Sequence, residues 1–579
     1  MIIGLDVGGT NTDVVLLSKK GLIREVKVPT DSSDLFHTVL TGLERVMEQI
    51  DPQKISRVVL STTLTTNAII QNTIPQVGMI VSSGPGIDPE FYRTNPHYYT
   101  VSGSIDHRGR EITPVNETEV KDIIERLKSD GIEHVGVIGK FSARNPNHEL
   151  KIFSLMKDRF EKIFLGHQCS GNLSFPRRIA TTFLKTATYP LHKRFFEAVK
   201  KSLDQKGFSV PIHILKADGG TMSFESSIDY PGQTILSGPA ASVMGAIAFA
   251  PEQKDVVVLD IGGTTTDMAV LINRVPVLEP LGIEISGYKT LIRSLKTRSI
   301  GLGGDSTVRV TDVGLTIGPD RKGPAMAFGG DVPTPTDALF ALGLIKTGDR
   351  EKALKGIGAI AADLGVPVEV AASKIFDKCC MDILEQVQHM VDGMNSKPVY
   401  TVHELHEGYK IKPSHIMILG GPATCFAERL KKFSDLTVNA VPKWHVANAI
   451  GAALARTTCE VTLFADTERE MAIAPEENFS QRVQRDFFKK DAIDTANNLL
   501  RQKALEKGAK SPEDLEMEVL EELEFNMVRG FHTTGKNIRV KVQIKPGLIG
   551  EYAPIINKLL DEHSNIQKKK GGLISRLIG

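Results

Sequence analysis

The sequence predicts an α/β protein of two related lobes, followed by a charged and mainly helical C-terminal appendage. A nine-residue segment near the N-terminus returns in the middle of the chain. Between the two copies, short apolar stretches alternate with amphipathic ones, and the composition changes after Thr458. These observations divide the 579 residues into lobes at 1–170 and 171–459 and an appendage at 460–579.

The repeated segment is the most informative feature. It reads LDVGGTNTD at Leu5–Asp13 and LDIGGTTTD at Leu259–Asp267, and seven of the nine positions are identical. Aliphatic and β-branched residues flank both copies, which predicts a strand, a tight Gly-Gly turn and a second strand each time. A spacing of about 250 residues is too long for a solenoid repeat. We therefore expect two copies of one domain that face each other across a ligand.

Between the copies, the hydrophobic pattern predicts strands and helices in alternation. Strands are expected at 58–60, 77–81 and 135–139, and helices at 117–129 and 191–205. Such alternation is typical of a largely parallel sheet with helices on its faces.

The appendage is rich in charge, with 20 acidic and 19 basic residues in 460–579. We predict helices at about 481–507 and 512–528 and a strand at 537–545, where the pattern alternates. A solvated helical surface accounts for most of this charge.

Composition excludes several classes of protein. Hydrophobic residues make up 41% and the formal net charge is +1, so the chain is neither disordered nor a dedicated nucleic-acid binder. The five cysteines form no CxxC pair, which argues against a disulfide framework and a thiolate zinc site. With no signal-like N-terminus and no long uncharged apolar stretch, a cytoplasmic location without a membrane span is expected.

The repeated turns have the chemistry of phosphate binding. Backbone N–H groups approach a phosphate closely only where side chains are absent, and neighbouring hydroxyl and amide groups add donors. The expected phosphate-binding residues are Gly8, Gly9, Thr10, Asn11, Thr12, Gly262, Gly263, Thr264, Thr265 and Thr266.

Each repeat also carries two acids, which would repel a phosphate in direct contact. Asp6, Asp13, Asp260 and Asp267 therefore imply either Mg²⁺ held through water or a general base. We take all four as candidate catalytic residues, and Asp6 and Asp260 as candidate metal ligands.

In these features the chain resembles the superfamily of actin, hexokinase and heat-shock chaperone ATPases. The resemblance implies ribonuclease H-like lobes around a nucleotide cleft and an adenosine-contacting turn at Gly420, Gly421 and Pro422, after an apolar stretch. Small-residue segments at 238–248 and 447–455 resemble the helices that cross between the lobes.

Within that superfamily, the chain is most similar to the hydantoinase A and 5-oxoprolinase family. The blocks that carry this resemblance are Thr62–Ala68, Asp218–Met222, Leu236–Ala240, Asp260–Asp267, Gly318–Pro319, Gly323–Ala325 and Pro335–Ala338. Residues 296–306, with Gly303 and Gly304 as expected cofactor contacts, match the family's DxHTVGAGGGS segment.

The resemblance implies an enzyme that uses ATP and Mg²⁺ to phosphorylate the carbonyl or enolate oxygen of a substrate. The substrate would be 5-oxoproline, a hydantoin-like cyclic amide or a related carbonyl compound. A second subunit or a homo-oligomer is a further implication.

Three positions depart from the family pattern. Leu60, Lys296 and Arg298 stand where the family has His, Asp and His. Acids also replace the usual Asn and Gly at Asp218 and Asp305. These changes leave two alternatives open, namely an ATPase that reactivates or remodels a partner protein and a small-molecule kinase.

Overall fold

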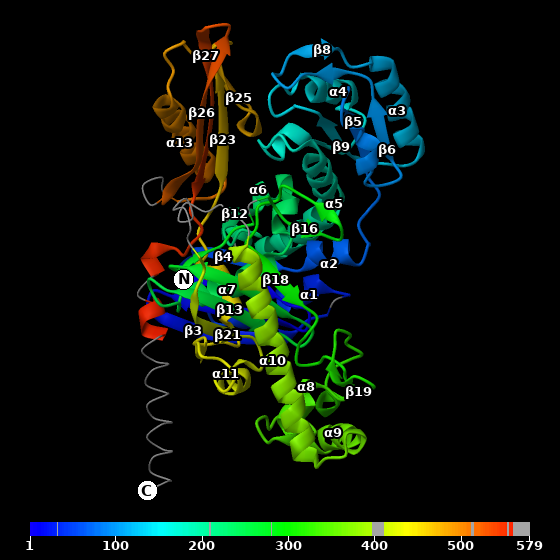
Figure 1. Ribbon diagram of the computed structural model, residues 1–579, viewed down its shortest axis with the longest axis vertical. Coiled ribbons are helices and arrows are strands. Elements are labelled where there is room, and N and C mark those ends of the chain that lie inside the picture. Colours follow the sequence, from blue (N-terminus) through cyan, green and yellow to red (C-terminus); the bar gives the residue numbers. More distant parts are fainter. Residues whose placement is uncertain are drawn as a thin grey trace.

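The computed structural model describes residues 1–31, 33–205, 207, 210–279, 281–396, 410–510, 515–552 and 555–559. Its centre holds two six-stranded sheets, and further layers extend from both ends of this core (Figure 1).

The first lobe is built on a sheet in the order β12-β11-β4-β1-β2-β3. Its strands are β1 (Ile2–Val7), β2 (Asn11–Ser18), β3 (Gly21–Pro29), β4 (Arg57–Thr62), β11 (Ile212–Leu215) and β12 (Thr221–Ser223). Helix α1 (Leu35–Met47) contributes Val39, Leu43 and Val46 to the core that covers one face. Since β11 and β12 come from residues 212–223, the lobe takes strands from both sides of the expected boundary at residue 170.

The second lobe repeats the first. Its strands are β13 (Asp255–Ile261), β14 (Thr266–Ile272), β15 (Val275–Pro276), β18 (Thr297–Ile300), β21 (Pro413–Leu419) and β22 (Thr437–Ala440). In both lobes the order is third, second, first, fourth, fifth: β3-β2-β1-β4-β11 and β15-β14-β13-β21-β22. The first two strands are antiparallel, and the fourth and fifth run parallel to the first. The expectation of two related lobes is confirmed.

Two helices of small residues cross at the centre of the molecule. They are α7 (Ser237–Ile247) and α12 (Ala447–Leu454). A Cβ atom on Gly451 would stand 2.2 Å from the backbone nitrogen of Gly245, so the helices meet backbone to backbone. Helix α12 lies equally close to β1, because a Cβ on Gly4 would be 2.1 Å from the carbonyl oxygen of Ala449. At these two contact positions only glycine permits this spacing.

A four-stranded parallel sheet rises from one end of the first lobe (Figure 1). Its strands are β5 (Gly78–Ser82), β6 (Tyr98–Val101), β9 (His134–Gly139) and β10 (Lys162–Leu165). Helices α3 (Glu117–Ser129) and α4 (Asn147–Met156) pack on it, and the long helix α5 (Phe175–Gln205) connects it to the core. The predicted strands, helices and parallel pairing in this region are confirmed.

The C-terminal part forms an antiparallel sheet, so the expectation of a mainly helical appendage is wrong. Its strands are β23 (Glu460–Asp466), β24 (Met471–Ala474), β25 (Phe479–Arg482), β26 (Met517–Arg529) and β27 (His532–Ile544), with one described helix, α13 (Lys489–Glu506), packed on them. The expected strand at 537–545 matches the second half of β27 up to Ile544. Of the expected helix at 512–528, residues 512–514 lie outside the described residues and most of the remainder is β26. The many Glu, Leu and Met residues of β26 favour helix, but pairing with β27 along its length prevails.

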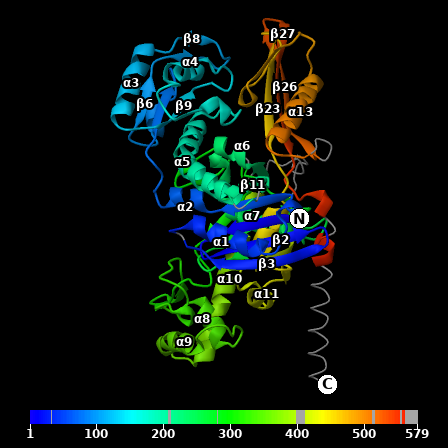
Figure 2. The same ribbon diagram turned by 180° about the vertical axis from the view of Figure 1, so that it is seen from behind.

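Figure 2 shows from behind that this C-terminal sheet stands beside the four-stranded sheet of the first lobe. An ion pair of 2.6 Å between Arg108 and Glu468 links the two. At the opposite end of the core lie α8 (Pro335–Ala341), α9 (Arg350–Leu364) and α10 (Val368–Asn395) (Figure 1). Within the described residues no single helix is long and apolar enough to cross a membrane; α9 and α10 pass that test only as a pair bent by 89°.

Candidate active site

The first repeated segment forms a β-hairpin whose two acids stand opposite each other. Asp6 on β1 pairs with Asp13 on β2, and the N–H of Gly8 donates to the carbonyl oxygen of Asn11 at 3.1 Å. Gly9 and Thr10 are exposed at the turn, where their polar groups are free to meet a ligand. The hydroxyl of the buried Thr12 instead hydrogen bonds Thr30 Oγ1 at 3.0 Å, which makes Thr12 a support of the turn.

The second hairpin reproduces this geometry residue by residue. Asp260 pairs with Asp267, and the N–H of Gly262 donates to the carbonyl oxygen of Thr265 at 2.9 Å. Thr264 is exposed at the turn, whereas Thr266 is buried and donates from Oγ1 to the carbonyl oxygen of Leu302 at 2.6 Å.

The acids of the two hairpins come together at the start of α12, close enough for their charges to influence one another. The amide of Asn448, the second residue of α12, donates to Asp260 Oδ2 at 3.2 Å and also interacts with Asp6. Ser242 from α7 donates to the same Asp260 oxygen at 2.5 Å. The crossing helices therefore bring both hairpins together, as the paired motif predicts.

Burial removes these carboxyl groups from water, and nearby positive charge does not make up for the lost hydration. It raises the pKa of Asp6 to about 7, and the negative charges of Asp13 and Asp260 add to the effect. It also raises the pKa of Asp267 to about 7, with Asp260 as the neighbouring charge, and raises the pKa of Asp260 itself. Asp6 Oδ1 is buried without a hydrogen-bond partner among the described residues.

Lys27 is a cation in this cluster that the motif analysis missed. Its Nζ lies 2.8 Å from Asp13 Oδ1, and β3 carries it directly across from Asp13 on β2. Burial still raises the pKa of Asp13, although Lys27 acts in the opposite direction.

The expected contacts Gly303 and Gly304 lie against the second hairpin. A Cβ atom on Gly303 would be 2.6 Å from the carbonyl oxygen of Gly263, and the N–H of Gly304 donates to that of Gly262 at 2.9 Å. These glycines shape the turn through their close approach, which a side chain would prevent.

Arg321 is a second cation that sequence reasoning missed. Its guanidinium donates to Asp305 Oδ2 at 3.0 Å and to Thr264 Oγ1 at 3.1 Å, at the exposed turn of the second hairpin. The acid at position 305 therefore holds an arginine beside the expected phosphate site. A guanidinium there is well suited to phosphate oxygens.

The expected adenosine turn follows β21 and lies next to Asp260. Gly420 has φ +95°, and a Cβ there would stand 2.3 Å from the carbonyl oxygen of Ile261. Gly421 faces open space, and Pro422 precedes α11 (Ala423–Leu430). The turn is thus tight on its inner side and open on its outer side.

Three other family blocks act as supports. The blocks at 62–68 and 236–240 hold each other, since Ser237 Oγ donates to the carbonyl oxygen of Thr62 at 3.0 Å and the N–H of Leu236 donates to Thr66 at 2.9 Å. The carboxylate of Asp337 accepts the N–H groups of Met326 and Ala327 and so fixes the loop that follows Arg321.

The three departures from the family pattern lie outside the acid cluster. Leu60 is buried in the core of the first lobe. Arg298 is exposed on β18, where it donates to Gln386 of α10, and Lys296 lines the same groove between β18 and α10. In this chain these positions carry packing or surface charge.

Comparisons with known proteins find a family match in each half of the chain. The model of the hydantoinase/oxoprolinase N-terminal region matches residues 2–160, and that of hydantoinase/oxoprolinase matches residues 178–461. Caprolactamase subunit alpha of Pseudomonas jessenii is 23% identical over 490 residues, which cover 76% of this chain and 68% of that protein. Acetophenone carboxylase gamma subunit of Aromatoleum aromaticum is 25% identical over 441 residues, which cover 64% and 58%.

Solved structures share the fold over nearly the whole chain. Nucleotide-free acetone carboxylase superposes with a TM-score of 0.69 and 17% identity over 96% of this chain and 88% of that one. The ATP-dependent caprolactamase of Pseudomonas jessenii gives 0.68 and 19% over 95% and 88%. Because the two family models together match most of the sequence and each contains one of the hairpins, the chain belongs to the hydantoinase/oxoprolinase family.

Proposed function

We propose that this protein is an ATP-dependent hydrolase that phosphorylates the carbonyl oxygen of a cyclic amide, such as 5-oxoproline or a hydantoin, or of a related carbonyl compound. The observation that carries the proposal is the pair of matching hairpins whose four acids share one site. The ATP dependence named for caprolactamase and acetone carboxylase supports it.

In this proposal the exposed turns bind the phosphates of ATP. Backbone N–H groups at Gly9 and Gly263 and the hydroxyls of Thr10 and Thr264 supply donors, and Arg321 supplies a positive charge at the second turn. The open side of Gly421 leaves room for the nucleoside.

The acids fit a hydrated Mg²⁺ ion. Asp6 and Asp260 are carboxylates with raised pKa values and, for Asp6, an unpartnered buried oxygen, which is the environment that a divalent cation would relieve. Among the described residues no three His, Cys, Asp or Glu side chains converge as metal ligands. Binding through one or two carboxylates and water is the usual mode for Mg²⁺, which would neutralise charge on the transferring phosphoryl group.

The chemistry balances as one phosphoryl transfer followed by two reactions with water. The substrate's carbonyl oxygen attacks the γ-phosphorus of ATP, the bond to the β-phosphate oxygen breaks, and ADP leaves. Water then adds to the activated carbon with loss of a proton to a carboxylate, the ring C–N bond breaks as that proton passes to the leaving nitrogen, and an acyl phosphate remains. A second water hydrolyses the acyl phosphate to the ring-opened acid and inorganic phosphate. A carboxyl group with a pKa of about 7, such as Asp6 or Asp267, is poised to accept a proton near neutral pH.

The test is phosphate release from Mg-ATP by the purified protein, alone and with 5-oxoproline, hydantoin, caprolactam, acetone or acetophenone. Stimulation by a cyclic amide with formation of the ring-opened acid is expected. Absence of stimulation by every compound, with and without an added partner subunit, would count against the proposal.

The altered positions favour one alternative. In this chain Leu60, Lys296 and Arg298 replace the histidine, aspartate and histidine of the family. This replacement makes an ATPase that remodels a partner protein the second candidate. It predicts ATP hydrolysis stimulated by a protein and indifferent to carbonyl compounds. A small-molecule kinase, the third candidate, would leave a phosphorylated product instead of free phosphate.

We also propose that the protein works with a second subunit. The related caprolactamase and carboxylase chains are named as subunits. Phe525 is 61% and Phe531 101% exposed on the hairpin of β26 and β27, and exposed aromatic rings are frequent at protein contacts. Co-purification of a partner that is lost in Phe525→Ser/Phe531→Ser would support this site of contact, whereas a partner retained by that variant would place the contact elsewhere.

A further inference from the structure

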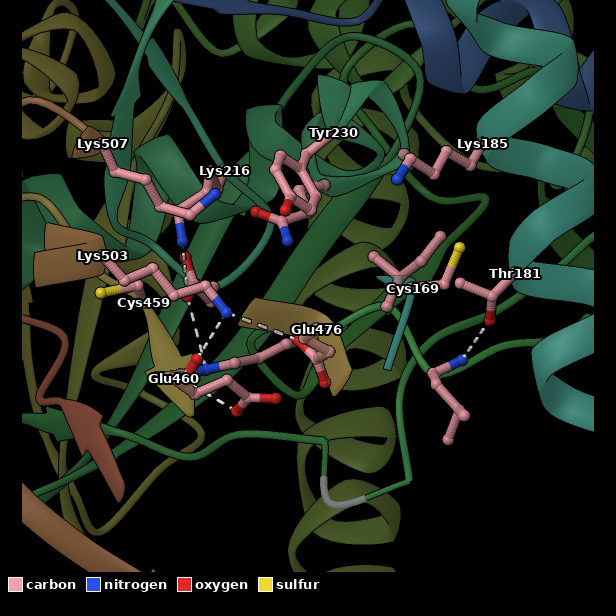
Figure 3. A pocket seen from close by; sticks show the side chains of 16 residues that line it. Cys169, Thr181, Lys185, Lys216, Tyr230, Cys459, Glu460, Glu476, Lys503 and Lys507 are labelled. Carbon is pink, nitrogen blue, oxygen red and sulfur yellow. Dashed lines mark hydrogen bonds and ion pairs between the residues drawn. The ribbon is translucent and has the colours of Figure 1, made fainter. Parts of the chain in front are cut away.

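A second charged cavity lies away from the hairpins, where the first lobe meets the C-terminal sheet. It is lined by α5, by the turn between β11 and β12, by the segment after α6 (Phe224–Asp229), and by β23 and α13 (Figure 3). Its volume of 60 Å³ suits four to six water-sized groups, at roughly 10–15 Å³ for each.

Most of the charged groups in this cavity are already paired. Asp218 lies 3.1 Å from Lys216 and 3.3 Å from Arg293, and these cations lower its pKa to about 2 against the opposing effect of burial. Glu460 is held by Arg293 and by Lys541, which lies 3.0 Å away. The acids of the cavity therefore have partners of their own.

Lys503 is also neutralised. Its Nζ lies 2.5 Å from Glu477 and 3.5 Å from Glu476, both in the turn after β24. A hydrogen bond to the carbonyl oxygen of Glu460 at 2.8 Å completes its set of contacts.

Two further lysines have no carboxylate partner among the described residues. Lys507, just after α13, is 4% exposed, and its Nζ is buried without a hydrogen bond. Its Nζ lies 3.7 Å from the ring centroid of Tyr230, and that of Lys185 on α5 lies 4.6 Å from the same centroid. Figure 3 shows the two side chains on opposite sides of this ring.

A buried ammonium group without an anion is unfavourable, because desolvation is not compensated. Burial lowers the pKa of Lys507 to about 7, and the positive charges of Lys503, Lys216 and Lys185 lower it further, against Cys459. Burial also lowers the pKa of Lys185. The tyrosine ring offers each lysine only a cation–π contact.

We propose that this cavity binds a small oxyanion of the carboxylate or phosphate type, with four or five non-hydrogen atoms, at the edge of the Tyr230 ring within reach of both Lys185 and Lys507. The anion supplies the missing negative charge and accepts the unused donors of both lysines. Because Lys185 belongs to the first lobe and Lys507 to the C-terminal part, the ligand ties these two parts together. The site does not depend on the proposed ATP chemistry.

Calorimetric titration of the nucleotide-free protein at constant ionic strength tests the proposal. Acetate and inorganic phosphate are titrated separately, which distinguishes the two kinds of oxyanion, with chloride as the reference salt. Lys507→Met should weaken binding of the preferred anion by roughly tenfold or more, since it removes a charged hydrogen-bond donor. Lys490→Met, at an exposed position of α13, is the matched control and should bind like the wild type.

A second measurement uses only the wild-type protein, so its result does not depend on whether the variant folds. Crystals soaked in selenate should show an anomalous peak within hydrogen-bond reach of Lys185 and Lys507. Peaks confined to the hairpin turns, or equal oxyanion affinity in wild type and Lys507→Met, would overturn the proposal. Phosphate binding at the hairpins is unaffected by Lys507→Met, so the two sites are distinguished.

Discussion

Replacing Asp6 with asparagine should stabilise the metal-free protein while it abolishes activity. The pKa of Asp6 is about 7 in the folded chain and 3.8 as the reference value, so the folded state holds its proton across about three pH units in which the unfolded state has lost it. For an acid whose pKa is raised by folding, stability is lost as the pH rises from the unfolded toward the folded value. The cost of Asp6 grows from about 1.5 kcal/mol at pH 5 to about 4 kcal/mol at pH 8, at ~1.4 kcal/mol per pH unit.

Asparagine cannot ionise, so Asp6→Asn escapes this cost. Thermal unfolding in EDTA should show a higher Tm for the variant, with a gain about 2 °C larger at pH 8 than at pH 5. Asp363→Asn, at an exposed acid of α9, should change neither. Mg²⁺ should raise the Tm of the wild type at pH 8 and do so less in Asp6→Asn. Equal Tm values for wild type and Asp6→Asn at pH 8 would refute the idea that an uncompensated buried charge sits at this position.

Three further outcomes follow from the site. Asp260→Ala should lower phosphate release at least 10²–10³-fold with an unchanged circular dichroism spectrum, and near-normal turnover would mean that the catalytic face lies elsewhere. Gly420→Ala should destabilise the protein by about 1–3 kcal/mol in urea unfolding, because its Cβ meets a carbonyl oxygen at 2.3 Å and its φ is +95°, whereas Gly421→Ala should change stability little. Arg321→Met should raise the KM for ATP severalfold, while Lys322→Met, one residue along and exposed, should leave it unchanged; equal KM values would remove Arg321 from the nucleotide site.

The duplicated hairpin could be found from sequence because its features are local. Each acid, glycine and threonine lies within nine residues, and strand, turn and strand follow directly from the pattern. The alternation of strands and helices predicted the parallel sheet for the same reason. The family blocks were visible too, although the structure shows that several of them hydrogen bond to loops or to each other.

The remaining site residues reach the hairpins only through tertiary structure. Lys27 comes from the third strand, Asn448 from a helix more than 180 residues after Asp260, and Arg321 from a loop pinned by Asp337. A signal for Asn448 did exist, since it is a polar residue at the start of an otherwise small and apolar helix. Strand β26 shows that a local signal can also mislead. Its composition favours helix, and only its alternation of Leu523, Phe525 and Met527 indicates a strand.

The crossing of α12 over β1 has a consequence for synthesis of the chain. One face of the first sheet is closed by Ala449 and its neighbours, yet Gly4, against which Ala449 packs, is made about 440 residues earlier. At a translation rate of 5–20 residues per second, roughly 20–90 s pass before that face is covered. The first lobe thus leaves the ribosome with an open apolar surface, and its completion waits for the end of the second.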